Sequence, residues 1–270
     1  CLWDLINGGA ETLLLRMKRL IKMLKVDSLF KSFGALLATD NLSFQVKKGD
    51  IHAIIGPNGA GKTTLIGQLT GEIESDSGSI LFDGNNISGV PVHLRSAHGL
   101  ARSFQITNIF HDLTTWDNVA LAVQAHAGHS FHFWKNASKE RELRQPALEF
   151  LGIVGLEKRA GFIAGLLSHG EHRQLEIAMA LATNPKMLLL DEPMAGMGPK
   201  ESLAMVDILI KLKHKLTILL IEHDMDVVFT LADRITVLVN GRGIATDTPD
   251  AIRKNPEVIA AYLGEESYHA

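Results

Sequence analysis

At 270 residues the chain is long enough to bury the core of one large domain, or a core with a subdomain. A net charge of -3 and a pI near 6.5 exclude the strongly basic surface of a typical nucleic-acid-binding domain. The single cysteine, Cys1, excludes an internal disulfide framework and favours a reducing compartment, and no apolar run approaches the ~18 residues of a membrane-spanning helix.

Residues 1–22 differ in character from the rest of the chain. Basic residues between positions 16 and 22 interrupt scattered leucines, so the segment lacks the apolar region of a signal peptide. A basic amphipathic helix for a membrane surface is one interpretation of residues 13–24. We favour the other, an upstream extension outside the fold, because strand patterns begin at Leu24; the expected domain covers residues 23–266.

A glycine-rich loop follows the first predicted buried strand. Alternating patterns predict strands at 24–29 and 41–46, and the apolar run 51–55 predicts a buried strand. The residues that follow match G-x-x-x-x-G-K-[ST] and precede a predicted helix at 64–70, which disfavours a glycine-rich turn with an accidental lysine. Such a loop turns backbone N–H groups toward a polyphosphate. The candidate nucleotide-binding residues are therefore Gly56, Pro57, Asn58, Gly59, Ala60, Gly61, Lys62, Thr63 and Thr64.

The middle of the chain, from about 107 to 167, is predicted to be mainly helical. Its predicted helices cover 116–124 and 138–151, after short strands at 79–84 and 101–105. Between the helices, His126, His129 and His132 are spaced three apart. No cysteine or acidic residue stands beside them, so we expect hydrated or locally bonded histidines rather than a metal site.

Two adjacent carboxylates end a later apolar strand. Residues 186–193 deliver Asp191 and Glu192 at the C-terminal end of that strand, the edge where α/β sheets place their ligands. Asp191 is suited to hold Mg²⁺ together with the Thr63 hydroxyl. Glu192 would point toward the γ-phosphate and polarise the attacking water, while Lys62 would reach the β- and γ-phosphates.

Strands and helices alternate through the rest of the sequence. The predicted elements are helices at 172–183 and 199–213 and strands at 216–221 and 234–239. Such alternation predicts a mainly parallel sheet covered on both faces. His223 stands at the end of the strand at 216–221, which could lie beside the Asp191 strand, so His223 could contact the γ-phosphate. Alone, it would more often be an ordinary loop histidine.

Five landmarks in this order resemble those of the ATP-binding cassette (ABC) ATPases, over residues 24–266. They are the P-loop, Gln105, the motif Leu-Ser-His-Gly-Glu at 167–171, the Asp191-Glu192 pair and His223. The resemblance implies an α/β fold in which a P-loop (RecA-like), mainly parallel sheet carries an antiparallel β subdomain and a helical subdomain at about 107–167. It also implies an ATP hydrolase coupled to transport that binds ATP and Mg²⁺.

The resemblance assigns further roles residue by residue. Ser168, Gly170 and Glu171 would form the signature motif, which meets the γ-phosphate of ATP held by the other subunit. Phe33 would stack on adenine. Gln105 would contact Mg²⁺ and link to the membrane partner, which makes 106–110 the expected docking surface. The implied catalytic residues are Glu192 and His223, and the implied Mg²⁺ ligands are Thr63, Gln105 and Asp191.

Two departures from the common family pattern are visible. The signature L-S-G-G-Q has His169 and Glu171 here, and the loop after Glu192, usually S-x-L-D, reads Met-Ala-Gly-Met at 194–197. Both leave the serine hydroxyl and the glycine backbone in place. They bear on communication between subunits rather than on nucleotide binding.

Four runs narrow the resemblance to the branched-chain amino acid uptake ATPases. They lie at 101–105, 175–178, 191–197 and 255–264. The subfamily implies a peripheral subunit on the cytoplasmic face of a bacterial inner membrane, paired as a homodimer or with a paralogous ATPase. The implied partners are integral membrane permease subunits and, indirectly, a periplasmic substrate-binding protein, with no nucleic acid. The implied cargo is a branched-chain amino acid or a related amino acid or amide.

Three alternatives remain open on the sequence. A soluble ABC ATPase of DNA repair or translation usually carries tandem cassettes or a long coiled coil, whereas this chain has one cassette and no heptads. The ABC ATPase of another transport system would share nearly the same cassette. A P-loop small-molecule kinase would need an acceptor pocket and a lid, and would not need the Ser168 motif.

Overall fold

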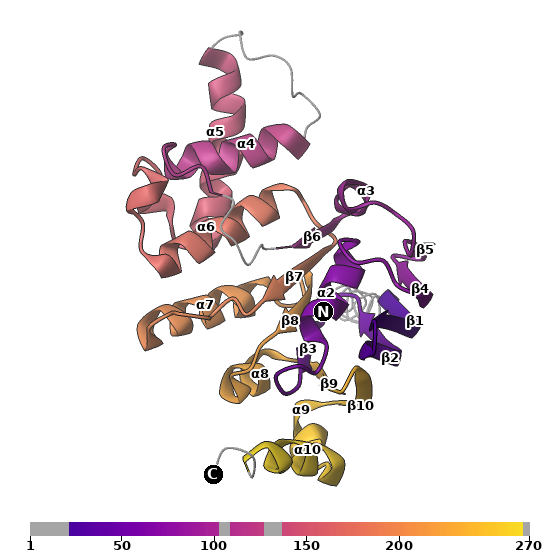
Figure 1. The fold of residues 1–270 in the computed structure, drawn as a ribbon. Helices are drawn as coiled ribbons and strands as arrows, with labels where there is room; N and C mark the ends of the chain where they lie inside the picture. Colours follow the sequence, from indigo (N-terminus) through magenta and orange to yellow (C-terminus); the bar gives the residue numbers. More distant parts are fainter. Residues whose placement is uncertain (1–21, 103–108, 127–136, 267–270) are drawn as a thin grey trace, which may run out of the picture. The chain divides into compact units, whose positions relative to one another are not determined.

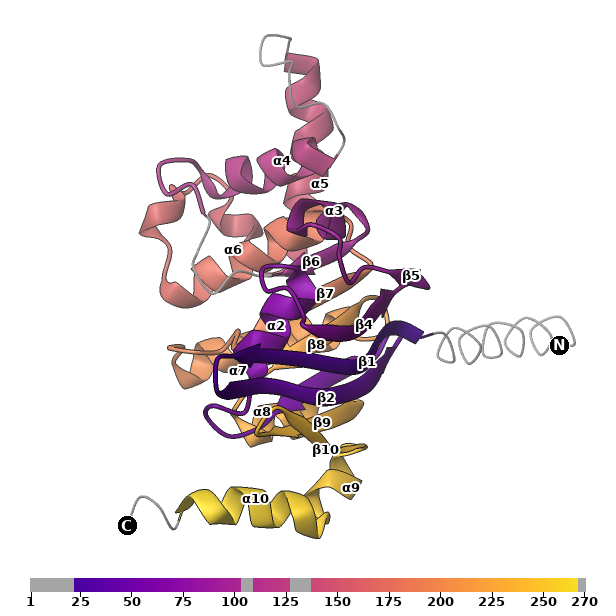
Figure 2. The same cartoon turned by 45° about the vertical axis from the view of Figure 1, so that its right-hand side comes forward.

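The computed structural model describes residues 22–102, 109–126 and 137–266 of the chain (Figures 1 and 2). Within these ranges the chain forms two compact units, one from residues 22–95 with 213–266 and one from residues 96–212. The P-loop belongs to the first unit, and the Asp191-Glu192 pair and the Ser168 motif belong to the second. None of the helices in the described ranges is both long and apolar enough to cross a membrane.

The first unit contains an antiparallel sheet with the strand order β2-β1-β4-β5. In β2, buried Leu42, Phe44 and Val46 alternate with exposed neighbours, so one face of the strand covers the core. β1 extends well beyond the predicted 24–29, because it pairs with β2 along its whole length, and a strand's own pattern does not reveal a distant partner. The bounds are β1 (Lys22–Phe33), β2 (Leu36–Lys47), β4 (Ser77–Phe82) and β5 (Asn85–Asn86).

A second sheet of the first unit carries the P-loop. Its strands follow the order β10-β9-β3-β8, in which β3 is parallel to β9 and β8, and β10 is antiparallel to β9. Every residue of β3 and β8 is buried, as the near-continuous apolar runs of central parallel strands should be. The predicted bounds of β3 and β9 are confirmed. The strands are β3 (Ile51–Ile55), β8 (Thr217–Ile221), β9 (Arg234–Val239) and β10 (Arg242–Asp247).

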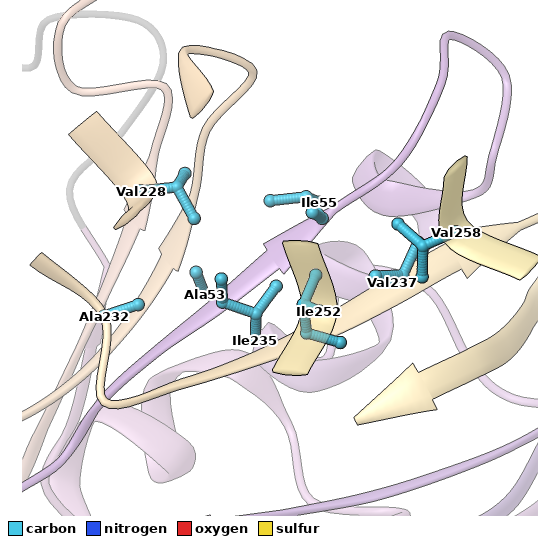
Figure 3. Close-up of a cluster of buried hydrophobic side chains, with 8 residues drawn as sticks. All are labelled: Ala53, Ile55, Val228, Ala232, Ile235, Val237, Ile252 and Val258. Carbon is cyan, nitrogen blue, oxygen red and sulfur yellow. The ribbon is translucent and has the colours of Figure 1, made fainter. Parts of the chain in front are cut away.

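Aliphatic side chains from strands and C-terminal helices form one core cluster of the first unit (Figure 3). Ile252 and Val258, from α9 and α10, are almost fully buried in it. Burying an aliphatic side chain of this size stabilises a fold by about 1.5–3 kcal/mol, so the C-terminal helices belong to this core. The cluster comprises Ala53, Ile55, Val228, Ala232, Ile235, Val237, Ile252 and Val258. The helices are α2 (Lys62–Thr70), α8 (Met225–Leu231), α9 (Pro249–Arg253) and α10 (Pro256–Glu266), and α3 (Val92–Ala97) spans the division between the units.

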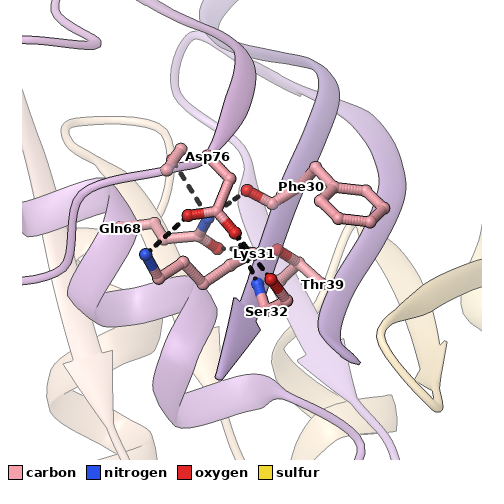
Figure 4. Close-up of polar contacts among 7 residues, drawn as sticks. Phe30, Lys31, Ser32, Thr39, Gln68 and Asp76 are labelled. Carbon is pink, nitrogen blue, oxygen red and sulfur yellow. Dashed lines mark hydrogen bonds and ion pairs between the residues drawn. The ribbon is translucent and has the colours of Figure 1, made fainter. Parts of the chain in front are cut away.

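Polar contacts tie the helix after the P-loop to the antiparallel sheet (Figure 4). Gln68 of α2 is buried and accepts a hydrogen bond from the Thr39 hydroxyl of β2 at 3.2 Å. Asp76 accepts from Lys31 Nζ and from the Ser32 N–H, each at 2.7 Å, and these bonds lower the pKa of Asp76 to about 2. Together they hold the β1–β2 hairpin in place beside α2.

His52 of β3 gives the first unit a pH-dependent stability. The side chain is fully buried, with Nε2 2.8 Å from the Thr236 hydroxyl. Burial, with a smaller effect of the positive charge of Arg234, lowers the pKa of His52 from 6.5 to about 3. As the pH falls below 6.5 the unfolded chain therefore takes up the proton first, and stability is lost progressively toward pH 3.

At pH 5 we expect the free energy of unfolding to be about 2 kcal/mol lower than at pH 7, because His52 stays buried and neutral in the folded chain while it is protonated in the unfolded chain. Urea unfolding at the two pH values measures this loss. The matched variant is His52→Gln, which keeps a hydrogen-bonding group for the Thr236 hydroxyl but does not titrate. The same pH dependence in the wild type and the variant would contradict the prediction.

The second unit combines two parallel strands with a group of helices. β6 and β7 pair from Leu100↔Met187 to Arg102↔Leu189. α4 and α5 confirm the two predicted helices and extend one or two residues beyond them at each end. The bounds are β6 (Leu100–Arg102), α4 (Thr115–His126), α5 (Ala137–Ile153), α6 (His169–Ala182), β7 (Met187–Asp191) and α7 (Pro199–Leu212), with short 3₁₀ turns η1 (Glu157–Arg159) and η2 (Ala164–Leu166).

Candidate nucleotide site

Two glycines allow the P-loop to run directly against neighbouring strands. At Gly56 a Cβ would lie 2.1 Å from the carbonyl oxygen of Leu238 in β9. Gly61 has a left-handed φ of 100°, and a Cβ there would lie 2.1 Å from the carbonyl oxygen of Ala38 in β2. Neither position accepts any other residue without displacing backbone. The pattern that predicted the loop therefore has a steric basis in this fold, and α2 begins at the next residue, Lys62.

Lys62 arches over its own loop. Its Nζ donates hydrogen bonds to the carbonyl oxygens of Gly56 and Pro57, the second at 2.9 Å. Thr63 is exposed in the first turn of α2, where backbone N–H groups lack helical partners and the positive end of the helix dipole lies. An ammonium, a hydroxyl and such N–H groups suit a polyphosphate. Of the other predicted loop residues, Ala60 is buried, Thr64 is half-buried, and Asn58 and Gly59 are exposed.

Phe33 lies at the tip of the β1–β2 hairpin in the same unit. Its ring is about half exposed, at 49%, and Lys31 Nζ lies 5.4 Å from the ring centroid. Exposed Leu36 and Leu37 continue this apolar tip, and Ala38, the next residue, is the one whose carbonyl oxygen meets the P-loop. An exposed aromatic ring on a strand that touches a phosphate-binding loop suits a nucleotide base.

Asp191 ends β7 as a buried carboxylate with a cationic neighbour. Its Oδ2 lies 3.4 Å from a guanidinium nitrogen of Arg102 at the end of the adjacent strand β6. Burial raises the pKa of Asp191, Arg102 opposes the rise, and the charge of Glu192 adds to it. A carboxylate destabilised by burial and partly compensated by a positive charge is suited to bind a metal cation.

Glu192 adopts a backbone conformation that is rare for its residue type. Its φ is +47°, in the left-handed region, directly after the buried strand β7. For a residue other than glycine this backbone conformation costs about 1–3 kcal/mol of conformational energy, and such strained residues cluster at functional sites. The turn is closed by a hydrogen bond from the Ala195 N–H to the Glu192 carbonyl at 3.0 Å. The half-buried carboxylate thus occupies a position that helix or strand geometry would not give it.

His223 follows β8 in the first unit and is 66% exposed. β8 pairs in parallel with β3, with Ile221 opposite Ile54, so His223 lies at the same sheet edge as the P-loop. The preceding residue, Glu222, is almost fully buried and accepts a hydrogen bond from the His223 N–H at 3.2 Å. Asp224 caps α8 immediately afterwards. The imidazole is therefore presented to solvent on a tightly bonded turn.

The signature motif forms the start of α6. Ser168 is its N-cap residue, and its hydroxyl accepts the N–H of Glu171 at 3.2 Å while Glu171 Oε2 accepts the N–H of Ser168 at 2.9 Å. Glu171 Oε1 also accepts Arg159 Nε at 2.9 Å. The helix consequently begins at His169 rather than at the predicted His172. Ser-x-x-Glu is itself the capping-box pattern, so the sequence already contains a signal that places the start of α6 at His169.

Several predicted residues fall outside the described ranges. Gln105, most of the expected docking segment 106–110, and two of the three spaced histidines, His129 and His132, are among them. Of the implied Mg²⁺ ligands, Thr63 and Asp191 are described and both carry oxygen donors, which Mg²⁺ prefers. Within the described ranges no cluster of three metal-ligating side chains is preassembled.

Three further polar residues at these sites were missed by sequence reasoning. The sequence patterns place Arg102 in a strand and Glu201 in a helix, and they give Glu222, between a strand and His223, no role. All three act through contacts with residues close to the predicted site, at Asp191, His223 and Ser168 respectively. Only the Glu222–His223 contact joins neighbours in sequence; the partners of Arg102 and Glu201 are distant, and no local pattern points to them.

Sequence comparisons connect this chain to transport ATPases. Residues 39–195 match the sequence profile of the ABC transporter, and residues 244–268 match that of the branched-chain amino acid ATP-binding cassette transporter. Two curated relatives align over 250 residues, covering 90% of this chain and 98% of their own length. They are the high-affinity branched-chain amino acid transport ATP-binding proteins BraF of Pseudomonas aeruginosa, at 40% identity, and LivG of Escherichia coli, at 39%.

Solved structures show the same similarity. The crystal structure of the ADP conformation of an ATP-binding cassette of an ABC transporter has a TM-score of 0.78 and 32% identity, over 90% of this chain and 99% of that cassette. A dimeric post-hydrolysis ATP-binding cassette bound to ADP and Pi has a TM-score of 0.70 and 25% identity, over 84% of this chain and 99% of the cassette.

Proposed function

This chain belongs to the ATP-binding cassette (ABC) transporter family, and on that premise we propose that it hydrolyses ATP to power uptake of branched-chain amino acids or a related amino acid or amide. The observation that carries the proposal is the P-loop, with two glycines that admit no side chain and Lys62 held over the loop. The names of BraF and LivG, both branched-chain amino acid transport ATP-binding proteins, support the cargo.

Each described site residue has a role in this proposal. The P-loop N–H groups and Lys62 hold the phosphates of ATP, and Phe33 stacks on the base. The Thr63 hydroxyl and the Asp191 carboxylate hold Mg²⁺, which when bound neutralises charge on the phosphates. Glu192 polarises the attacking water, and the exposed His223 contacts the γ-phosphate.

The proposed working unit is a dimer in which two cassettes enclose two ATP molecules. Ser168 and Gly170, at the N-terminal end of α6, meet the γ-phosphate held by the partner's P-loop. The exposure of Ser168 supports a role outside its own subunit. So does the relative solved as a dimer with ADP and Pi. The partner is a second copy or a paralogous ATPase.

An exposed apolar patch supports docking to membrane permease subunits at the cytoplasmic face of the inner membrane. Phe110, the last residue of the expected docking segment, is 55% exposed, and Leu166 is 79% exposed. A hydrogen bond from the Gly165 N–H to the His111 carbonyl at 2.9 Å holds the two segments side by side. Contiguous exposed apolar residues typically mark protein contacts. The patch comprises Phe110, Phe162, Ile163 and Leu166.

Reconstitution tests the proposal. We expect the purified chain with ATP and Mg²⁺ to release phosphate without any added acceptor. Together with permease subunits of a branched-chain amino acid transporter, it should drive ATP-dependent uptake of labelled leucine into proteoliposomes. A phosphorylated small molecule in place of free phosphate would contradict the ATPase assignment. Uptake of urea or another amide without uptake of leucine would leave the ATPase assignment intact and would contradict branched-chain amino acids as the cargo.

A further inference from the structure

The signature serine is hydrogen-bonded to a carboxylate within its own unit. Ser168 Oγ donates to Glu201 Oε1 at 3.0 Å, although 33 residues separate them. Glu201 lies in the first turn of α7, just after the loop that follows Asp191 and Glu192. None of the motifs assigned above includes Glu201.

The single proton of the Ser168 hydroxyl is already donated in this arrangement. A serine hydroxyl has one proton to donate, and here that proton goes to Glu201. One lone pair accepts the Glu171 N–H at 3.2 Å. A phosphate oxygen that approached Ser168 would need the same proton that Glu201 holds, and it would also meet the negative charge of the Glu201 carboxylate. The contact therefore opposes the interaction that a signature serine must make.

Further contacts fix Glu201 and join the signature motif to the loop after Glu192. Glu201 Oε2 accepts the Gly198 N–H at 3.3 Å. His169 Nε2 lies 3.1 Å from the Ala195 carbonyl oxygen, which gives the unusual histidine of the motif a partner in that loop. A Cβ at Gly170 would lie 2.7 Å from the Glu201 carboxyl carbon, so a larger residue there would displace the Glu201 side chain from this position.

We propose that Glu201 is a positioning residue that holds the Ser168 proton away from the γ-phosphate and so restrains ATP-driven dimer closure. The proposal rests on the proposed function, because it assumes that Ser168 binds ATP across the dimer. Closure then requires the Ser168–Glu201 bond to open. Because Glu201 also bonds the loop after Glu192, a movement of that loop would release Ser168.

The direct test is ATP-dependent dimerisation in a Glu192→Gln background, which keeps ATP uncleaved. Adding Glu201→Gln should lower the ATP concentration at half-dimerisation about tenfold or more, since a hydrogen bond to a charged group is replaced by one to a neutral amide. Sedimentation velocity against ATP concentration gives this midpoint. Asp207→Asn, an exposed charge removal on the same helix, is the matched control and should leave the midpoint unchanged.

A double-mutant comparison separates this role from a merely structural one. Ser168→Ala alone should raise the midpoint, because a phosphate contact is lost. In the presence of Ser168→Ala, Glu201→Gln should promote dimerisation much less than it does with the serine present, since no serine proton is left to release and only the repulsion between carboxylate and phosphate is relieved. A structural role would instead predict a weaker dimer with Glu201→Gln and an effect that persists without the serine.

The outcomes distinguish this proposal from the function on which it rests. If no ATP-dependent dimer forms in any background, the enclosed-ATP dimer is wrong and this inference falls with it. If the dimer forms and weakens with Ser168→Ala, but Glu201→Gln leaves its midpoint unchanged or raises it, the role of Glu201 alone is overturned.

Discussion

Replacing Glu192 with glutamine is expected to slow ATP hydrolysis by about 10²–10⁴-fold, the usual contribution of a general base, while ATP still binds. Glutamine keeps the size of the side chain and its hydrogen-bonding capacity but loses the carboxylate that would polarise water. The left-handed backbone at this position is no harder for glutamine than for glutamate, so the turn after β7 should persist. Because ATP stays uncleaved, the variant should form a stable dimer with ATP but not with ADP.

Phosphate release and size-exclusion chromatography with each nucleotide measure the two parts of this prediction. Asp207→Asn, which also exchanges a carboxylate for an amide on an exposed helix face, is the control for general loss of charge. Turnover at the wild-type rate in Glu192→Gln would remove the proposed role of this residue. A variant that binds ATP, hydrolyses it slowly and stays monomeric would point to a paralogous partner, and mixing in that paralogue tests this directly.

Lys62→Ala is expected to abolish hydrolysis and to weaken ATP binding by roughly 10–100-fold, the worth of a hydrogen bond to a charged group. In the structure the Lys62 ammonium donates hydrogen bonds to two carbonyl oxygens of its own loop, those of Gly56 and Pro57. Loss of the ammonium therefore removes charge from the phosphate site more than it removes packing. The fold should remain, with a melting temperature close to that of the wild type.

Binding of a fluorescent ATP analogue, phosphate release and thermal unfolding together measure this outcome. Lys48→Ala, which removes an exposed lysine from a turn of the same unit, is the matched control and should behave like the wild type. Near-normal turnover in Lys62→Ala would refute the P-loop assignment. A large fall in melting temperature would show instead that Lys62 is needed to hold the loop together.

The P-loop and the carboxylate pair were predictable from sequence because their signals are local. The glycines and lysine of residues 56–64 lie within one turn between a strand and a helix, and their spacing alone carries the geometry. The apolar run of β3 likewise has the length and composition of a buried central strand whatever its neighbours are. Helices α4 and α5 were found for the same reason, since helical periodicity is read within one segment.

Tertiary structure decided the features that depend on residues distant in sequence. The length of β1 follows from its pairing with β2, and the environment of Asp191 follows from Arg102, 89 positions earlier. The Ser168–Glu201 bond joins the ends of two different helices, and no pattern in either segment indicates the other. The left-handed φ of Glu192 has the same origin: local preference opposes it, so only the surrounding fold can impose it. Sequence thus determined which groups make up the predicted nucleotide site, while long-range contacts determined how the protons and charges of those groups are arranged.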